Sequence, residues 1–267
     1  MRFRSATMRR FPAWRGLRGL RGLRGLRDLL LTLLLVCLAR TGFAASFSVV
    51  SGSMQPTLLI GDRMIAEPFA YGYSTASLPF GEDLPRGARL FGRVPARGDV
   101  VVFRSPSQPG VTWVKRVIGL PGDHVALRHG RLFLNKTAVA WRAQGIGREE
   151  LADGAMVPAA RFVETLPGGV THPILKRFAE GPLDEVPEFA VPDGRVFVMG
   201  DDRDNSADSR VPVADGGVGL LPLWNLQGRV RLLTLSRDIV RPGVRLVADP
   251  LAWLATIRPD RTLRIVR

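Results

Sequence analysis

The sequence is poor in the residues that most often build metal and redox sites. It has one cysteine, Cys37, and three histidines, His124, His129 and His172, in 267 residues. One cysteine can form neither an internal disulfide nor a cysteine-based zinc site, and the histidines have no metal-ligand spacing. The sequence also lacks a G-x-S-x-G nucleophile elbow. Pattern alone leaves open a Ser-His-Asp triad that uses His124, although this residue follows a Pro-Gly turn, where exposure to solvent is expected.

The first 27 residues contain no acidic residue. Nine arginines precede Asp28, and residues 15–27 repeat Arg-Gly-Leu with a period of three, which fits no amphipathic helix. They stand directly before an apolar run, where basic residues hold the end of a membrane segment in the cytoplasm. The alternative is an arm that binds nucleic-acid phosphates. Because the remaining positive charge is dispersed, we favour a membrane-surface leader and expect no nucleic-acid partner.

A long apolar run is also missing. Leu29–Ala39 has eleven residues before Arg40, whereas a helix that spans a membrane needs about 20. Either the span borrows flanking residues, with arginines that snorkel, or the leader, the short apolar core and the small residues at 42–45 form a cleavable secretory signal. Both interpretations place everything after about residue 50 on the far side of the membrane.

The chain after residue 50 predicts a mainly β fold, because alternating segments are frequent and no convincing amphipathic helix appears. His129-Gly130 is a candidate hairpin turn. Residues 136–190 have weak periodicity and scattered Gly and Pro, so we interpret them as an inserted subdomain. Residues 59–66 predict a turn followed by a strand. The other predicted strands are Asp99–Arg104, Thr112–Ile118, Val125–Leu127, Arg131–Leu134, Arg195–Met199 and Arg229–Leu235.

Two serines, Ser51 and Ser53, stand two residues apart between an apolar run and Pro56. If this stretch is extended, both side chains point to the same face. A serine hydroxyl is a weak nucleophile unless a base takes its proton. The same pattern is also common at the end of a strand with turn-forming serines.

Lys115 is a candidate for that base. In the strand 112–118, alternation places it on one face with Trp113 and Val117. Burial disfavours the ammonium and lowers a lysine pKa, which leaves a neutral amine able to accept a proton. The competing interpretation is a surface lysine that snorkels to solvent.

The polar loop Gly200–Arg210 follows the strand 195–199. Its carboxylates could bind calcium, but the loop lacks the glycine and the distal glutamate of an EF-hand. Alternatively, one hydroxyl holds a lysine amine and an Asp-Arg pair fixes the corner.

Together these three stretches resemble the type I signal peptidases, serine proteases with a Ser-Lys dyad. Residues 51–58 (SGSMQPTL), 115–123 (KRVIGLPGD) and 200–210 occur in the order of that family's motifs. The resemblance implies a nucleophile, Ser53, a general base, Lys115, and an oxyanion hole formed by the Ser51 hydroxyl and the Ser53 N–H. It further implies that Ser206 orients the lysine amine and that Asp208 and Arg210 support the loop. No metal or cofactor is implied.

The implied fold is a β-rich catalytic core with an inserted second β subdomain, preceded by an N-terminal transmembrane helix. The implied activity is removal of signal peptides from exported preproteins with small residues at P1 and P3. It places a single-pass enzyme in the lipid of a bacterial cytoplasmic membrane, with the catalytic domain on the outer, periplasmic side. The expected division is a cytoplasmic leader (1–27), an anchor (28–48), a catalytic core (49–135 and 191–245), an inserted subdomain (136–190) and a C-terminal tail (246–267).

Three differences from the family's usual pattern leave alternatives open. Asp202 stands where the family usually has Asn, the loop 211–217 is longer than in short members, and Gly-Leu-Leu-Pro at 219–222 replaces Gly-Phe-Val-Pro. One span is visible where some members have two. The alternatives are a specialised relative that matures one pilin or conjugation protein, and an inactive membrane-anchored β-domain that binds a partner.

Overall fold

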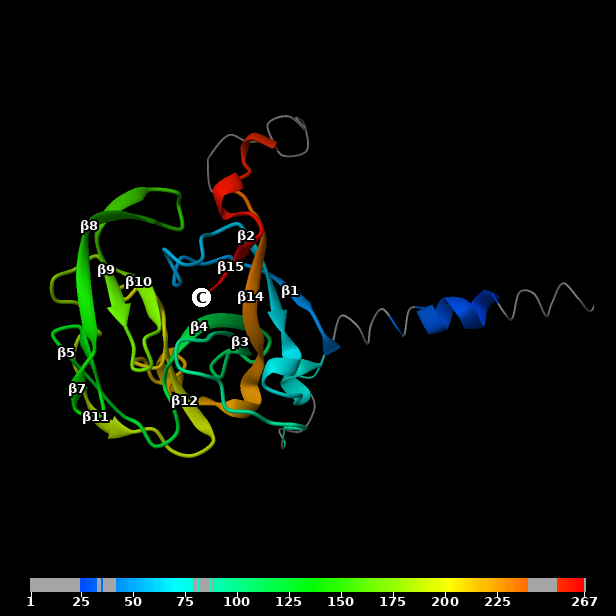
Figure 1. Cartoon of the computed structure of the whole chain (residues 1–267), viewed down its shortest axis with the longest axis horizontal. Helices are drawn as coiled ribbons and strands as arrows, with labels where there is room; N and C mark the ends of the chain where they lie inside the picture. Colours follow the sequence, from blue (N-terminus) through cyan, green and yellow to red (C-terminus); the bar gives the residue numbers. More distant parts are fainter. Residues whose placement is uncertain are drawn as a thin grey trace, which may run out of the picture. The chain divides into compact units, whose positions relative to one another are not determined.

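The computed structural model describes residues 25–32, 35, 42–78, 81, 87, 89–239 and 254–266. The chain divides into two compact units, residues 1–40 and 41–267 (Figure 1). In the first unit, residues 25–32 and 35 are helical and their leucines are exposed. Most of the predicted leader and anchor lies outside the described residues. Within the residues that the structure does describe, no helix has the length and apolar character of a membrane span.

The second unit contains an antiparallel sheet of eight strands (Figure 1). Its order is β1-β2-β14-β3-β4-β12-β13, and β15 pairs with β14. The strands are β1 (Ala45–Ser48), β2 (Asp62–Glu67), β3 (Val100–Arg104), β4 (Thr112–Gly119), β12 (Arg195–Met199), β13 (Leu221–Pro222), β14 (Leu226–Ser236) and β15 (Arg264–Ile265). The predicted mainly β fold is therefore confirmed.

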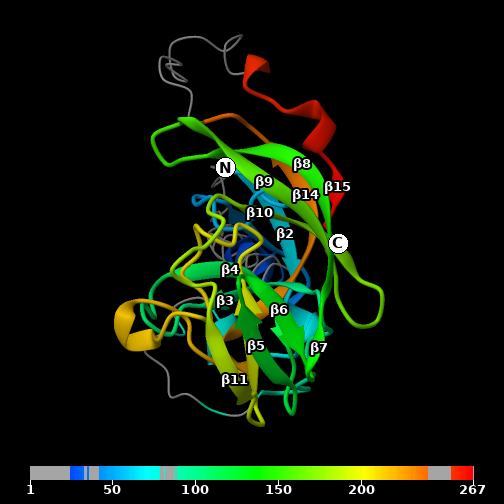
Figure 2. The same ribbon diagram turned by 90° about the vertical axis from the view of Figure 1, so that its left-hand side faces the viewer.

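Two smaller sheets complete the unit, and Figure 2 shows β8–β10 above the sheet that contains β5–β7 and β11. The first has the order β11-β5-β6-β7, and the second has the order β10-β9-β8. Their strands are β5 (His124–Arg128), β6 (Arg131–Leu134), β7 (Thr137–Ala138), β8 (Ala140–Glu150), β9 (Met156–Thr165), β10 (Thr171–Lys176) and β11 (Val186–Ala190). Both residues of the predicted hairpin turn have positive φ, 49° at His129 and 71° at Gly130, as a type I′ turn requires.

Residues 136–190 are far more regular than their sequence suggests. β8 and β9 form a long antiparallel hairpin whose register shifts between Ala143 and Ile146. Gly145 lies in this interval with φ +91°, which is typical of a bulge. Most of β8 is exposed on both faces, so its sequence has no alternation of apolar and polar residues.

Paired strands of the structure cross three of the predicted boundaries. Residues 45–48, the end of the predicted anchor, form β1 and pair with β2. Residues 264–265 of the predicted tail form β15 in the large sheet. β5 and β6, which we assigned to the catalytic core, pair in one sheet with β11 from the predicted insertion. In each case the backbone of one segment pairs with a segment that is distant in the sequence, and amino-acid composition does not reveal such pairing.

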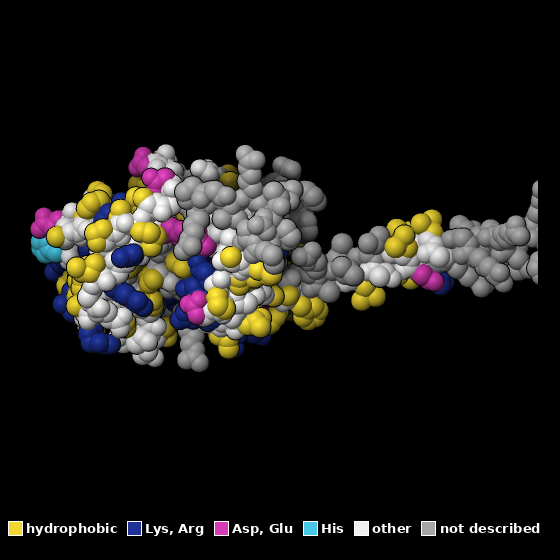
Figure 3. Space-filling model, turned by 90° about the horizontal axis from the view of Figure 1, so that it is seen from above, with side chains coloured by type: hydrophobic (Ala, Val, Ile, Leu, Met, Phe, Trp, Pro, Cys, Tyr) yellow, Lys and Arg dark blue, Asp and Glu magenta, His cyan; other side chains and the backbone are white. Residues whose placement is uncertain are grey.

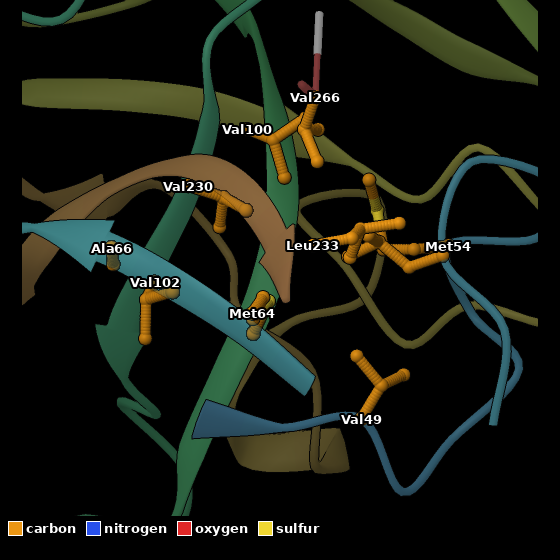
Figure 4. Close-up of a cluster of buried hydrophobic side chains, with 10 residues drawn as sticks. Val49, Met54, Met64, Ala66, Val100, Val102, Val230, Leu233 and Val266 are labelled. Atoms are coloured by element: carbon orange, nitrogen blue, oxygen red, sulfur yellow. The ribbon is translucent and has the colours of Figure 1, made fainter. Parts of the chain in front are cut away.

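The core beneath the large sheet holds the turn that follows β1 (Figure 4). Met54 and Leu58 are fully buried in this cluster, together with Val49, Met64 and Leu233. Burying one such side chain contributes about 1.5–3 kcal/mol. The turn is therefore fixed to the sheet by its apolar residues, and the polar residues between them are held in place.

Positive side chains are spread over the second unit. On the face shown in Figure 3, Lys and Arg side chains alternate with hydrophobic and uncharged ones. This distribution agrees with the dispersed charge of the sequence after the arginine leader.

Candidate active site

Ser51 and Ser53 lie in a turn, so the condition of an extended stretch, under which alternation would place both on one face, is not met. Residues 51–57 form bends and turns, with hydrogen bonds from the Gln55 N–H to the Gly52 carbonyl (2.9 Å) and from the Leu58 N–H to the Met54 carbonyl (2.9 Å). The two serine hydroxyls nevertheless lie 3.4 Å apart. A turn, and not alternation along a strand, therefore brings the two hydroxyls together.

The Lys115 amine lies beside the Ser53 hydroxyl. Its Nζ is 2.6 Å from Ser53 Oγ, and it lies 5.6 Å from the centre of the Trp113 ring. Lys115 is only 3% exposed. Burial lowers its pKa from 10.5 to about 8, although the negative charge of Asp208 acts to raise it. The apolar strand face therefore places a lysine with a lowered pKa next to a serine, as the alternation indicated.

Arg116, the next residue of β4, joins the strand to the serine turn. Its guanidinium makes two hydrogen bonds to the Asp201 carboxylate, of 2.8 and 2.7 Å, and both side chains are buried. Thr57 of the turn donates its hydroxyl to the same carboxylate. Burial is the largest single effect and acts to raise the pKa of Asp201, but the charge and hydrogen bonds of Arg116, with His172 and the Thr57 hydroxyl, together hold the pKa below its usual value. Strand, turn and loop are thus fixed to one another by a bidentate pair.

The loop 200–210 packs against the same turn. The Asp202 N–H donates to the Ser53 carbonyl (3.2 Å). Asp208 and Arg210 form a fully buried bidentate pair, with N–O distances of 2.9 and 2.8 Å. Asp208 also accepts the Gly200 N–H (3.0 Å). This is the corner-fixing Asp-Arg pair that we predicted as the alternative to calcium binding. Two further loop carboxylates pair with protein cations, Asp201 with Arg116 and Asp204 with Lys176.

Ser206 lies close to this centre. A side chain at Gly200 would overlap both the Ser206 hydroxyl and the Ser53 carbonyl, so these groups are close neighbours. The Ser206 hydroxyl is buried and has no hydrogen-bond partner in the part of the chain that the structure describes. A hydrogen bond from Ser206 to Lys115 is therefore not formed in this conformation.

The histidines lie in other environments. His124 is half exposed on β5, with Nδ1 3.1 Å from Glu188, and His129 is exposed in the hairpin turn. His172 is buried, with Nε2 3.4 Å from Glu164. Its pKa is lowered by burial and then by the positive charge of Arg116. Among the described residues, Ser53 forms side-chain hydrogen bonds with Lys115 and Ser51. We therefore set aside the Ser-His-Asp triad that would use His124.

A cleft of about 350 Å³ opens in front of the serine turn. Most of its lining residues are apolar, and Ser51, Ser53 and Lys115 are among the polar ones. Its lining residues are Phe47, Ser48, Val49, Val50, Ser51, Ser53, Met64, Val111, Thr112, Trp113, Val114, Lys115, Asn205 and Ala207.

Comparison with known proteins shows the family of this chain. A family model described as signal peptidase, peptidase S26, matches residues 23–235. The chain belongs to the S26 family of signal peptidases. It is 32% identical to signal peptidase I of Rickettsia typhi over 244 residues, which cover 86% of this chain and 89% of that protein. It is 34% identical to signal peptidase I of Rickettsia akari over 244 residues, 86% of this chain and 88% of that protein. A crystal structure of a signal peptidase I from Enterococcus faecalis aligns with 51% of this chain and 97% of that one, at 22% identity and a TM-score of 0.30.

Membership of the S26 family confirms the predicted resemblance and makes this chain a peptidase, a hydrolase of peptide bonds. The family match ends at residue 235. The described residues 254–266 add contacts beyond it, since the Arg261 guanidinium donates to the Thr57 carbonyl (2.9 Å) and pairs with Asp62 (2.8 Å).

Sequence reasoning missed two residues of β8, Glu149 and Glu150, that hold this S26 site together. The Gln55 amide donates to the Glu150 carbonyl (2.7 Å) and accepts the Glu150 N–H (2.9 Å). Glu149, the residue before it on β8, accepts a hydrogen bond from Asn205 of the loop (3.0 Å). Gln55 and Glu150 are 95 positions apart, and no local pattern marks either β8 residue as part of the site.

Of the differences from the usual S26 pattern, Asp202 is the one that reaches the site. It is fully buried and its N–H contacts the serine turn. In the longer loop, residues 213–215 form a short 3-10 helix, and Gly216 ends it with φ +83°. Within 219–222, Leu221 pairs with Val196 as part of β13.

Proposed function

We propose that this S26 peptidase is a membrane-bound serine endopeptidase that cleaves N-terminal signal peptides from exported preproteins with a Ser53–Lys115 dyad. The observation that carries the proposal is the buried Lys115 amine, 2.6 Å from the Ser53 hydroxyl and with a lowered pKa. With a pKa of about 8, a fraction of the amine is neutral near physiological pH, and this neutral form can accept the serine proton.

The reaction proceeds through an acyl-enzyme. Ser53 Oγ attacks the scissile carbonyl carbon while Lys115 Nζ takes the hydroxyl proton, and a tetrahedral oxyanion forms. Lys115 then gives this proton to the leaving amine as the peptide C–N bond breaks. A water molecule, deprotonated by Lys115, attacks the ester, and the proton returns to Ser53 as the acid product leaves.

Ser51 is our candidate for an oxyanion donor, together with the Ser53 N–H. The 3.4 Å between the two serine hydroxyls supports this role, because an oxyanion formed at the carbon attacked by Ser53 would lie within reach of both donors. One such donor is worth about 10²–10³-fold in kcat.

The substrate lies in the cleft as an extended chain. β12 pairs with β4 over the segment from Arg116 to Gly119, so among the described strands the edge of Thr112–Lys115 that faces away from β3 has no partner. An extended peptide can pair with such an edge. The small residues at P1 and P3 that the family resemblance implies are part of this proposal, as are the supporting roles of Ser206, Asp208 and Arg210.

The arginine leader and the apolar run support membrane anchoring. The helical residues 25–32 and 35 expose Leu26, Leu29, Leu30, Leu31 and Leu35, each at least half exposed, as lipid contact would require. We propose a single-pass anchor in a bacterial cytoplasmic membrane that ends before Ala45, with the catalytic domain on the outer side. The division into core and insertion also stays a proposal.

The test is cleavage of a panel of preproteins by detergent-solubilised full-length protein. Wild type should cleave many members at one site each, while Ser53→Ala and Lys115→Ala should lose activity by about 10⁴-fold or more. Ser46→Ala and Lys136→Ala are matched controls on exposed residues and should retain activity. Cleavage of a single panel member would favour a specialised maturation enzyme. Binding without cleavage by wild type would favour the inactive binding protein.

A further inference from the structure

Two carboxylic acids lie fully buried against the proposed active site without enough donors for both to be ionised. They are Asp202, in the loop 200–210, and Glu149, near the end of β8, and both have zero exposure. Both carboxyl oxygens of Asp202 and Oε2 of Glu149 have no hydrogen-bond partner among the described residues. Leaving such groups unpaired costs several kcal/mol per charge, so the charges of this pair need an explanation.

Both residues contact elements that define the site. Glu149 Oε1 accepts from Asn205 Nδ2 (3.0 Å) and from Arg177 Nη2 (2.9 Å), and Asn205 lines the cleft. The Asp202 N–H donates to the carbonyl of Ser53 (3.2 Å). The pair therefore links β8, the cleft wall and the nucleophile turn.

A single proton accounts for two of the three unpaired oxygens. If Asp202 is protonated, its O–H donates to Glu149, whose remaining charge is matched by Arg177 and Asn205. The groups that face Asp202 act mainly in this direction: burial raises its pKa most, Glu149 and Asp204 raise it further, the hydrogen bond with Glu149 also raises it, and Arg177 opposes them. Two close carboxyl groups that share a site share a proton for the same reason.

We propose that Asp202 and Glu149 share one proton at neutral pH and act together as positioning residues for Ser53 and Asn205. The shared proton has an electrostatic consequence for Lys115. A negative charge on Asp202 raises the pKa of the Lys115 amine, which would keep the base protonated. Holding the proton on Asp202 keeps the charge on Glu149, so the amine titrates at a lower pH.

The direct test is infrared spectroscopy of the resting protein with carboxyl-¹³C-labelled aspartate. We expect a carbonyl stretch of a protonated aspartic acid at neutral pH, which is lost in Asp202→Asn and retained in Asp193→Asn, an exposed control. Absence of this band in the wild type would overturn the proposal, and this readout does not depend on folding of any variant.

The functional test is the pH profile of kcat/KM, and it rests on the proposed role of Lys115. In Glu149→Gln the amide can donate to Asp202, so Asp202 ionises and the acidic limb should move to higher pH. A rise of about one pH unit lowers kcat/KM up to ~10-fold below the limb. The double variant Glu149→Gln/Asp202→Asn should return the limb toward the wild-type position. An equal shift in the single and double variants would contradict the proposal.

The two tests separate this inference from the function on which it rests. If the protonated aspartic acid is present but Lys115→Ala still cleaves preproteins, the dyad is wrong and the shared proton stands. If the dyad variants are inactive and the band is missing, the function stands and the shared proton is refuted.

Discussion

Replacing Lys115 by methionine should stabilise the folded protein while it abolishes activity. In the folded state the lysine has a pKa of about 8 instead of 10.5, because burial penalises its charge. At 1.36 kcal/mol per pKa unit, this difference corresponds to a cost of ~3 kcal/mol. The unfolded chain binds the proton more tightly, so the cost is fully present below about pH 8 and disappears as the pH rises through 10.5. Loss of the hydrogen bond to Ser53 offsets about 1 kcal/mol of the gain.

The assay is urea-induced unfolding of the detergent-solubilised protein at a series of pH values. The stability advantage of Lys115→Met should be about 2 kcal/mol below pH 8. It should shrink as the pH rises and, above the unperturbed lysine pKa, reverse to a deficit of about 1 kcal/mol, the lost hydrogen bond. Lys136→Met, at an exposed turn position, is the matched control and should show no such pH dependence. A difference between Lys115→Met and wild type that stays constant with pH would refute the reasoning.

Three further predictions concern the site and the anchor. Ser51→Ala should lower kcat by about 10²–10³-fold with little change in KM; a change in KM alone, measured by steady-state kinetics, would make Ser51 a substrate contact instead. Gly200→Ala should destabilise the fold by at least about 1–3 kcal/mol in denaturant unfolding, because its Cβ would overlap the Ser53 carbonyl and the Ser206 hydroxyl; unchanged stability and activity would show that the loop can move away. Mass spectrometry of membrane-extracted protein should find the intact N-terminus, whereas a mature start near Ala45 would identify a cleaved signal.

The sequence predicted well those strands whose apolar residues stand out locally. The strands 131–134 and 195–199 have the predicted bounds and β4 extends its prediction by one residue; apolar residues alternate in the first and form a continuous buried run in the second. β8 and β9 were missed, since most of β8 is exposed on both faces and its register shifts at Gly145. Backbone pairing between the two strands holds this hairpin together. This pairing produces no alternation of apolar and polar residues that the sequence could show.

The serine turn shows how two hydroxyls two residues apart can meet without an extended strand. We considered the case of an extended segment because alternation would then place Ser51 and Ser53 on one face. The stronger signal was the spacing of four between Met54 and Leu58, which are both buried and joined by a hydrogen bond between the Leu58 N–H and the Met54 carbonyl. Such spacing is typical of a helical turn, and it brings the hydroxyls together by a different route.

Long-range polar contacts could not be predicted. Lys115 was identified from its own strand face, but the pairing of Arg116 with Asp201 and of Asn205 with Glu149 joins segments 85 and 56 residues apart. Nothing in the local sequence around Glu149 distinguishes it from an exposed carboxylate. The difference at Asp202 was visible in the sequence, and its meaning depends on Glu149 lying beside it.

The most direct test of the Ser53–Lys115 dyad is the pH dependence of kcat/KM on a cleaved preprotein. Because activity requires the neutral amine, kcat/KM should rise with pH and level off above a pKa of about 8. Ser46→Ala should reproduce this curve. An acidic limb near 10.5, the unperturbed lysine value, would mean that Lys115 is not a buried base. It would contradict the account that places Ser53 and Lys115 at the centre of catalysis.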